Sequence, residues 1–251
     1  MKIRFGKLIA IAGSVLLSLT VPAFGQTTID FTGGYTTTWG NVSGDFGAGI
    51  YSATIDGLSS PGIICDDFND EIVSGETWSA TAIRASTLSS NLESTFFGGA
   101  IGLNGYAEVA TLVSALFNDT QSLYGLSVTQ AELSSAIWDI TSGGTLLGLD
   151  PTAQELVGDL TANINTEVTA LAGDTNLWLL VPNPRSGYTG NAAGREPQEM
   201  WTNVQGAGFT ALISNVPEGG NALIYLLLAG ATCFGAVYFN SRSRLGKSEA
   251  A

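Results

Sequence analysis

The stretch TWSATAI, residues 77–83, sets the fold class expected for this chain of 251 residues. Its apolar residues Trp78, Ala80 and Ala82 alternate with hydroxyl residues, as in a β-strand that buries one of its two faces. Upstream, similar short runs are separated by glycine, for example GIYSATIDG at residues 49–57. The first part of the domain is therefore expected to be built from strands.

Beyond about Gly105 the apolar period changes from that of a strand to that of a helix. The first of three expected helices has one apolar face, formed by Tyr106, Val109, Ala110, Val113 and Phe117. The second helix opens at Thr129, where Glu132 three positions later completes the pattern of a capping box.

The third helix is expected to begin at Asp150, a capping residue followed by proline at the first helical position. It should run unbroken to Gly173, after which strands return at NLWLLVPNP (residues 176–184) and EMWTNV (residues 199–204). These patterns predict an α+β domain over residues 26–215. It would combine a strand-built, β-sandwich-like scaffold with an inserted subdomain of about three helices.

The N-terminus has the layout of a secretory signal peptide. Three basic residues precede an apolar stretch at residues 8–21, and Ala23-Phe24-Gly25 forms a small-x-small cleavage site. We therefore expect residues 1–25 to be removed on export. An uncleaved membrane anchor is the alternative, which the short apolar stretch and the cleavage residues disfavour.

The C-terminus has the pattern of a membrane span. Residues 222–239 carry no charge, and a helix of this length measures about 27 Å, near the thickness of the hydrocarbon layer. The basic residues Arg242, Arg244 and Lys247 that follow should stay in the cytoplasm, which directs residues 26–215 outward. We therefore expect a C-terminal transmembrane helix. The alternative is a buried amphipathic helix, which rarely lacks every charge over this length.

Charge and composition exclude several functional classes. Residues 26–215 contain twenty acidic residues and three arginines, a net charge near −17 that disfavours nucleic acid as a partner. The chain has no histidine, which excludes Ser-His-Asp and Cys-His mechanisms and histidine-ligated metals. Because no lysine occurs between Lys7 and Lys247, a lysine–asparagine cross-link is not expected in the domain.

The two cysteines, Cys65 and Cys233, are not expected to pair, because Cys233 falls inside the predicted span. An acidic run follows Cys65 and offers oxygen atoms to calcium, although it lacks the spacing of an EF-hand loop. The residues of that run are Asp66, Asp67, Asn69, Asp70 and Glu71. We expect a solvated turn there, with no metal site and no cofactor.

The sequence VPEGG precedes the predicted span and its basic end, and consists of Val216, Pro217, Glu218, Gly219 and Gly220. This arrangement resembles the PEP-CTERM sorting signal, with glycine in place of the second proline of the usual motif. The resemblance implies an exosortase-like sorting enzyme as partner. That enzyme would cut near the motif and pass the domain from the cytoplasmic membrane to the cell surface or the extracellular matrix.

Two motifs in the body carry a second resemblance. GIICDDFNDEIVSGETWSA (residues 62–80) and AELSSAIWDI (residues 131–140) are similar to exported domains that pair Cys-Asp-Asp-Phe with Gln-x-Ala-Ile-Trp, and to the thioester domains of surface adhesins. Such adhesins join a cysteine to a glutamine. Ser134 stands at the position of that glutamine, and Gln130 lies one helical turn earlier. We therefore expect Cys65 to be a reduced, buried thiol without an internal cross-link.

These features predict an exported protein with a structural or adhesive role and no enzymatic activity. A first alternative is a carbohydrate-binding module, in which Trp39, Trp78 and Trp201 would form an exposed platform for extracellular polysaccharide. A second alternative is a glycan-acting enzyme that uses Asp66 or Asp67 together with another acid.

Overall fold

The computed structural model describes residues 26–41, 44–59, 62–68, 73–183 and 197–203. They belong to one compact unit, Phe24–Thr210, which combines a large antiparallel sheet with a group of helices. The predicted α+β class is confirmed. The predicted signal peptide (residues 1–25), the sorting motif, the span at residues 222–239 and the basic end lie outside the described residues.

Seven strands form the main sheet, and every neighbouring pair in it is antiparallel. Their order across the sheet is β3-β2-β1-β5-β8-β9-β4. The strands are β1 (Gln26–Asn41), β2 (Gly44–Ile55), β3 (Leu58–Ser59), β4 (Ile64–Cys65), β5 (Thr77–Arg84), β8 (Leu177–Pro182) and β9 (Met200–Asn203).

The sheet closes on itself, because the residue before β4 pairs with β2. Tyr51 and Ile63 exchange two backbone hydrogen bonds of 2.8 and 2.9 Å. Strand β1 bends midway, where Gly33 (φ 87°) and Gly34 (φ 85°) adopt a conformation that glycine tolerates best and the register with β2 shifts. The described strands therefore make one closed, barrel-like sheet, whereas the sequence predicted a sandwich-like scaffold.

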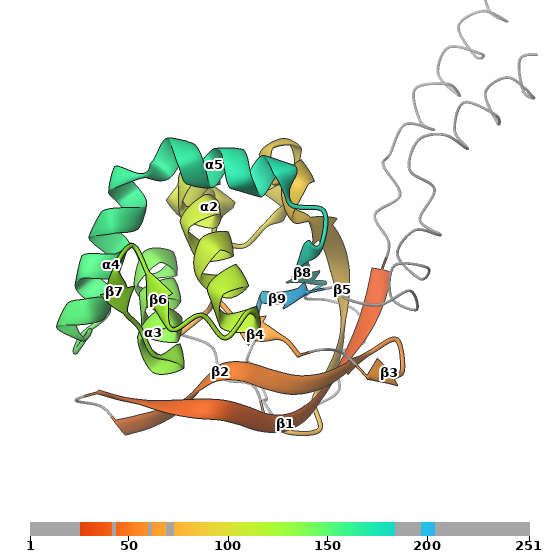
Figure 1. Ribbon diagram of the computed structural model, residues 1–251. Coiled ribbons are helices and arrows are strands. Elements are labelled where there is room, and N and C mark those ends of the chain that lie inside the picture. The colour runs from red at the N-terminus through yellow and green to blue at the C-terminus, as the bar shows by residue number, and fades with distance from the viewer. Residues whose placement is uncertain (1–25, 42–43, 60–61, 69–72, 184–196, 204–251) are drawn as a thin grey trace, which may run out of the picture. The chain divides into compact units, whose positions relative to one another are not determined.

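Four α-helices lie on one side of the long β1–β2 ribbon (Figure 1). Helix α2 contacts α3 and α5, and α3 contacts both β1 and β2. Two short 3-10 helices and a small hairpin complete the described elements. Their bounds are η1 (Ala85–Ser90), η2 (Leu92–Ser94), α2 (Gly98–Phe117), β6 (Ser122–Leu123), β7 (Leu126–Ser127), α3 (Gln130–Thr141), α4 (Pro151–Ala162) and α5 (Ile164–Gly173).

The predicted helix starts are confirmed at two positions. The Thr129 side chain accepts a hydrogen bond from the Glu132 backbone, and the Glu132 carboxylate accepts one from the Thr129 backbone at 2.6 Å. The Asp150 carboxylate accepts a bond from the Thr152 backbone at 2.8 Å. The third helix, however, is interrupted at Asn163, which has a non-helical φ of −105° and whose side chain donates to the Asp159 carbonyl.

Helix α2 forms the centre of the helical group. Among the described residues it alone has the length and composition of a membrane-crossing helix, and 56% of that apolar stretch is buried inside the domain. Tyr106, Leu112 and Val113 on its inner side are fully buried in the main core cluster. Helix α2 is therefore a core helix, and its Tyr106 lies beside the start of strand β9.

Candidate functional site

Strands β4 and β9 bring together two segments that lie far apart in the sequence. In their register Cys65 is opposite Met200 and Ile64 is opposite Trp201. Extending this register places Gln198 across from Asp67. Because side chains alternate along a strand, Cys65 and Gln198 share one face of the pair, whereas Asp66 and Glu199 share the other.

On the first face, the Cys65 sulfur touches the side chain of Gln198. The distance from Sγ to Oε1 is 2.8 Å, and the two residues are only 4% and 3% exposed. Gln198 Nε2 donates to the Asp67 carbonyl at 3.1 Å, which fixes the carboxamide in this orientation. The same carbonyl lies 2.9 Å from Sγ, and the Asp67 N–H donates to Sγ at 3.3 Å.

Helix α3 holds the Cys65 segment in place from the other side. Trp138 Nε1 donates to the Cys65 carbonyl at 3.2 Å, and the Thr141 hydroxyl donates to the Asp66 carbonyl at 2.5 Å. The Ala-Ile-Trp motif is thus connected to the Cys-Asp-Asp-Phe motif by side-chain hydrogen bonds to the main chain. These bonds hold the main chain at Cys65 and Asp66 against helix α3.

The structure holds Gln130, the glutamine named from the sequence, by hydrogen bonds to other partners. Its Oε1 accepts from the Thr36 hydroxyl at 2.6 Å and its Nε2 donates to Asp119 at 3.3 Å, so it is directed toward strand β1 and the end of α2. Ser134 is buried and accepts from the Gly49 N–H at 2.9 Å, which ties α3 to β2. The prediction that Cys65 is a buried thiol is confirmed, but a glutamine does lie beside it.

Sequence spacing does not predict that Gln198 lies beside Cys65, because the two residues are 133 positions apart and strand pairing brings them together. One signal was present. The segment EMWTNV was recognised as a strand, and the polar residues Gln198 and Glu199 stand directly at its start. A buried strand that begins with two hydrogen-bonding side chains favours a polar partner inside the core.

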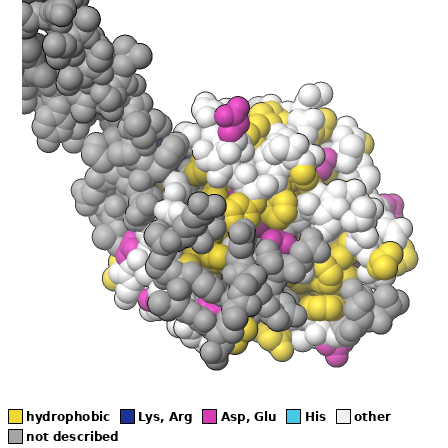
Figure 2. Space-filling view, turned by 180° about the vertical axis from the view of Figure 1, so that it is seen from behind, with side chains coloured by type: hydrophobic (Ala, Val, Ile, Leu, Met, Phe, Trp, Pro, Cys, Tyr) yellow, Lys and Arg dark blue, Asp and Glu magenta, His cyan; other side chains and the backbone are white. Residues whose placement is uncertain are grey.

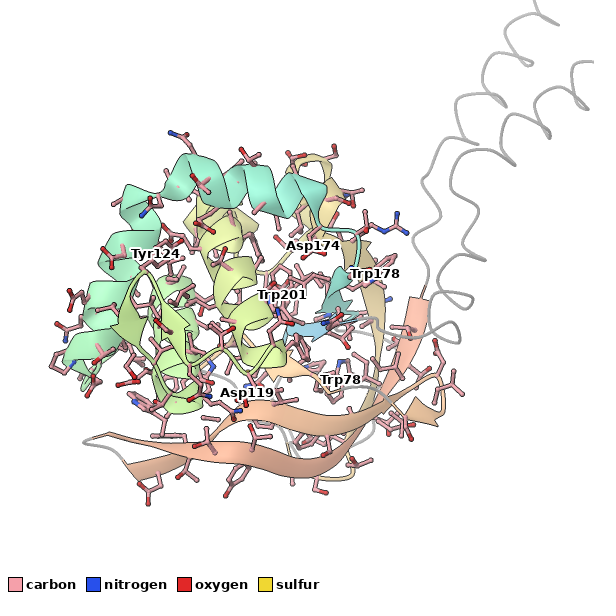
Figure 3. All side chains as sticks on the ribbon, viewed as in Figure 1. Trp78, Asp119, Tyr124, Asp174, Trp178 and Trp201 are labelled. Atoms are coloured by element: carbon pink, nitrogen blue, oxygen red, sulfur yellow. The ribbon has the colours of Figure 1, made fainter. Side chains whose placement is uncertain are left out.

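On the second face, two carboxyl groups are fully buried. Asp66 Oδ2 accepts from Trp201 Nε1 at 2.8 Å. Glu199 Oε1 accepts from the Tyr106 hydroxyl at 2.6 Å, and its Oε2 accepts from the Phe96 N–H at 2.9 Å. Both residues are 0% exposed. In Figure 3, Trp201 lies between the helices and the strands, which places this face inside the core.

Burial governs the electrostatics of the site. It raises the pKa of Asp66 well above its usual range, and the nearby Glu199 charge raises it further. It also raises the pKa of Glu199 to about 7, although the Tyr106 hydroxyl opposes the shift. Burial, followed by the Asp66 charge, raises the pKa of the Cys65 thiol, which is therefore protonated at neutral pH.

The first two residues of the acidic run after Cys65 do not lie in the solvated turn that the sequence predicted. Asp66 and Asp67 are buried at 0% and 7% exposure, and Asp66 accepts a hydrogen bond from Trp201. The run's last three acidic or amide residues, Asn69, Asp70 and Glu71, lie outside the described residues. Within the described part of the chain, no group of three acidic or cysteine side chains is placed to hold a metal ion.

The tryptophans do not form an exposed platform. Trp39 is 5% exposed, and Trp78 and Trp201 are 0% exposed. Trp39 packs edge-on against Trp138 at a centroid distance of 5.7 Å, as part of an aromatic cluster with Phe46 and Phe68. The alternative of a sugar platform built from these tryptophans is therefore wrong.

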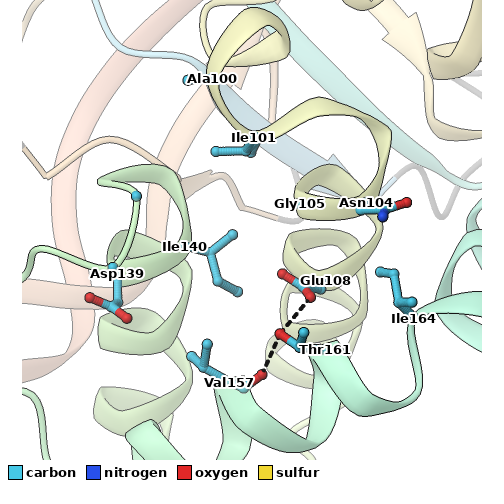
Figure 4. Close-up of a pocket in the computed structure, with 12 residues that line it drawn as sticks. Ala100, Ile101, Asn104, Gly105, Glu108, Asp139, Ile140, Val157, Thr161 and Ile164 are labelled. Carbon is cyan, nitrogen blue, oxygen red and sulfur yellow. Dashed lines mark hydrogen bonds between the residues drawn. The ribbon is translucent and has the colours of Figure 1, made fainter.

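A separate groove of about 360 Å³ lies among the helices. It is lined by residues of α2, α3, α4 and α5, including Asn104, Glu108 and Asp139 (Figure 4). The Glu108 carboxylate accepts from the Thr161 hydroxyl at 2.9 Å, and Asp139 accepts from the Leu146 N–H at 3.1 Å. None of the residues around Cys65 lines this groove.

Comparison with known proteins adds no residue to this site. No protein-family model matches the chain, and neither does any curated protein or any solved structure. The contact between Cys65 and Gln198 is therefore the observation from which a function is argued.

Proposed function

We propose that this chain is an exported cell-surface or matrix protein with an adhesive role, and that it acts through an internal thioester between Cys65 and Gln198. The observation that carries the proposal is the 2.8 Å contact between the thiol sulfur and the carboxamide oxygen. The motifs at both ends of the sequence support export and sorting.

The two side chains contain the atoms that a thioester requires. A carbonyl bond is about 1.2 Å long, so a sulfur 2.8 Å from Oε1 lies within about 4 Å of the carbonyl carbon. The Cys65 sulfur attacks that carbon, an S–C bond forms and the C–N bond of the carboxamide breaks. The thiol proton ends on the departing nitrogen, so that one ammonia is released and no oxidant is needed.

The surroundings orient the reacting groups and protect the bond once it has formed, although burial keeps the Cys65 thiol protonated at neutral pH and so slows its attack. The Asp67 main chain contacts the sulfur through its N–H and the amide nitrogen through its carbonyl, which keeps the reacting groups oriented. Burial of both side chains excludes water, the commonest nucleophile that would destroy a thioester.

A thioester gives the domain a covalent means of adhesion. Once the segments that cover the buried bond open, an amine or hydroxyl group of a partner attacks the acyl carbon of Gln198, forming an amide or an ester and returning the Cys65 thiol. Extracellular polysaccharide offers hydroxyl groups and proteins offer amines. The domain itself has no lysine between residues 26 and 215, so it has no lysine amine that would consume its own thioester.

The two alternative functions have less support. All five tryptophans are at most 6% exposed, which leaves no exposed tryptophan platform for a carbohydrate-binding module of the expected kind. The carboxyl groups of Asp66 and Glu199 are sealed in the core, whereas a glycosidase exposes its two acids to the sugar. Figure 2 shows other acidic side chains in separate spots over the described part of one face, not gathered around a cleft.

Intact-mass analysis of the full chain, exported and purified in mild detergent, tests the thioester. After signal removal, and with the ammonia that an N-terminal Gln26 can lose on cyclisation counted separately, the wild-type chain should be lighter than its sequence mass by one ammonia. Gln198→Glu and Cys65→Ser should each abolish this difference, and Gln130→Glu is the matched control that should retain it. A wild-type mass equal to the plain chain would overturn the proposal.

Sorting is tested separately on protein taken from the cell surface. A sorting enzyme that cuts near residues 216–220 should leave mature protein without peptides from residues 223–244. Replacing Val216 to Gly220 by serines should hold the protein in the membrane. Recovery of those peptides from mature surface protein would instead identify the tail as a permanent anchor.

Topology has its own test. A reporter fused after Ala251 should be active only if it works in the cytoplasm, because the basic residues after the span are expected to stay inside. A fusion that is active only in the periplasm would contradict the proposed orientation.

A further inference from the structure

The Asp66–Glu199 pair is a buried acidic pair without a counter-ion. Arg84 is the one basic residue in the described part of the chain, and it lies over the Trp178 ring at 4.8 Å. Two ionised carboxylates side by side in a core would each carry a large desolvation penalty and would repel one another. At least one of the two therefore holds a proton in the folded protein.

Hydrogen bonds indicate which oxygen carries that proton. Both oxygens of Glu199 accept bonds, from Tyr106 and from the Phe96 backbone. Asp66 Oδ2 accepts from Trp201, whereas Asp66 Oδ1 is buried and has no hydrogen-bond partner at normal distance. The strand register places Asp66 across from Glu199, and Oδ1 is the buried oxygen of Asp66 that accepts no bond, so it is the oxygen left to carry the hydrogen.

The position of the pair links it to the thiol. Asp66 directly follows Cys65, and Glu199 directly follows Gln198, on two strands that are neighbours in the sheet. Repulsion between two ionised groups here would push apart the same two main-chain segments that hold the sulfur against the carboxamide. A proton shared by the two carboxyl groups removes this repulsion and holds the two segments together.

Resting on the thioester proposed above, we infer that Asp66 and Glu199 are positioning residues, which hold one proton between them and thereby keep Cys65 in contact with Gln198. The other titratable groups that face the pair are Asp67, the Cys65 thiol and the Tyr106 hydroxyl of α2. Burial raises the pKa of Tyr106, so it stays a hydrogen-bond donor.

Two substitutions of nearly equal size should have opposite effects. In Asp66→Asn the amide oxygen accepts from Trp201 and the amide N–H points to Glu199, as the protonated acid does. In Glu199→Gln an amide nitrogen replaces one of two oxygens that both accept bonds. This nitrogen cannot accept a hydrogen bond, yet it faces a donor, either the Phe96 N–H or the Tyr106 hydroxyl. Asp66→Asn should therefore retain the contact, and Glu199→Gln should lose it.

The experiment measures the full-length chain between pH 6 and pH 10 with two probes. Methylamine incorporation at Gln198 reports opening of the thioester, and iodoacetamide labelling of the peptide that contains Cys65 reports exposure of the thiol. Circular dichroism at each pH confirms that the fold persists. The exposed Asp45, replaced by asparagine, is the control, and rates are compared as ratios between variants at the same pH.

At alkaline pH the pair loses its proton in the wild type and in Asp45→Asn. Both should then react with the two probes at least about tenfold faster than Asp66→Asn, because one pKa unit corresponds to a factor of ten. Glu199→Gln should react fast at every pH. Equal pH profiles in wild type and Asp66→Asn would overturn the inference. If the wild-type mass shows no loss of ammonia, the thioester proposal fails, and the iodoacetamide ratios still decide whether the proton positions Cys65.

Discussion

Two buried acidic clusters in this domain satisfy their carboxyl groups in different ways. The strand cluster consists of Cys65, Asp66, Gln198 and Glu199. The helix cluster consists of Glu108 and Glu167 with the hydroxyl groups of Thr111, Tyr124 and Thr161. In the helix cluster, Thr161 donates to Glu108 at 2.9 Å, and Thr111 and Tyr124 both donate to Glu167.

The two clusters differ in whether any buried polar atom remains without a hydrogen-bond partner. Hydroxyl donors reach both acids of the helix cluster, and neither Glu108 nor Glu167 has a buried oxygen without a partner. In the strand cluster Asp66 Oδ1 has no partner at normal distance, and a thiol lies against a carboxamide. The acids of the helix cluster are satisfied by hydroxyl donors, whereas the strand cluster keeps an unpartnered oxygen and a thiol–carboxamide contact, on which the thioester proposal rests.

Trp201→Ala should have the largest effect on stability. Removing a fully buried tryptophan costs about 3–5 kcal/mol, and Asp66 also loses its one hydrogen-bond donor. Urea denaturation followed by fluorescence or circular dichroism measures the change. A loss below about 2 kcal/mol would show that the strand cluster is not integrated into the core as described.

The pH dependence of stability should come next in size, with the strand cluster as its larger source, because burial raises the pKa of Glu108 in the helix cluster as well. Glu199 has a folded pKa of about 7 against an ordinary value of 4.5, so between these values the folded state binds more protons than the unfolded state. Stability is therefore highest below about pH 4.5 and falls as pH rises toward 7, by about 1.4 kcal/mol per pH unit for one proton. Asp66 acts in the same direction.

Denaturant midpoints at pH 5 and pH 7.5 check this prediction. Asp66→Asn should make the loss of stability between these two pH values smaller, whereas Asp45→Asn on the surface should leave that loss unchanged. A midpoint that rises with pH in the wild type would contradict the assignment of raised pKa values to this pair.

Two tyrosine substitutions compare the clusters directly. Tyr106→Phe removes a buried donor to Glu199 and should cost about 2 kcal/mol. Tyr124→Phe removes a donor to Glu167 from a side chain that is 37% exposed, and Thr111 still donates to that acid, so the cost should be about 0.5 kcal/mol. Equal losses in the two variants would show that the clusters do not differ in the way described.

Many of the strands and helices could be predicted from the sequence, because short patterns of residues determine local structure. The alternation at Trp78, Ala80 and Ala82 matches strand β5, and the caps at Thr129 and Asp150 start helices α3 and α4. Closure of the sheet between Tyr51 and Ile63 was not predicted. It depends on the order of the seven strands across the sheet, which no short window of sequence reports.

The candidate site was predicted only in half. The motif around Cys65 and the Ala-Ile-Trp motif were recognised together, and the hydrogen bond from Trp138 to the Cys65 carbonyl shows why they belong together. Gln198 was missed because its approach depends on the register between β4 and β9. Helical spacing pointed instead to Gln130, which its bonds to Thr36 and Asp119 hold elsewhere.

The smallest expected effect is that of Gln130→Ala. It removes hydrogen bonds between exposed groups and should change stability by no more than about 1 kcal/mol. It should not alter methylamine incorporation at residue 198. A changed rate of methylamine incorporation at residue 198 would show that Gln130 contributes to the site around Cys65.

Peptide mapping after methylamine treatment of the native chain tests the central claim most directly. The account predicts a methylamide on Gln198, none on Gln130, and a Cys65 thiol that becomes free as the label enters. An unmodified Gln198, together with a Cys65 thiol that was free before treatment, would contradict the thioester and leave the contact between the two side chains as core packing.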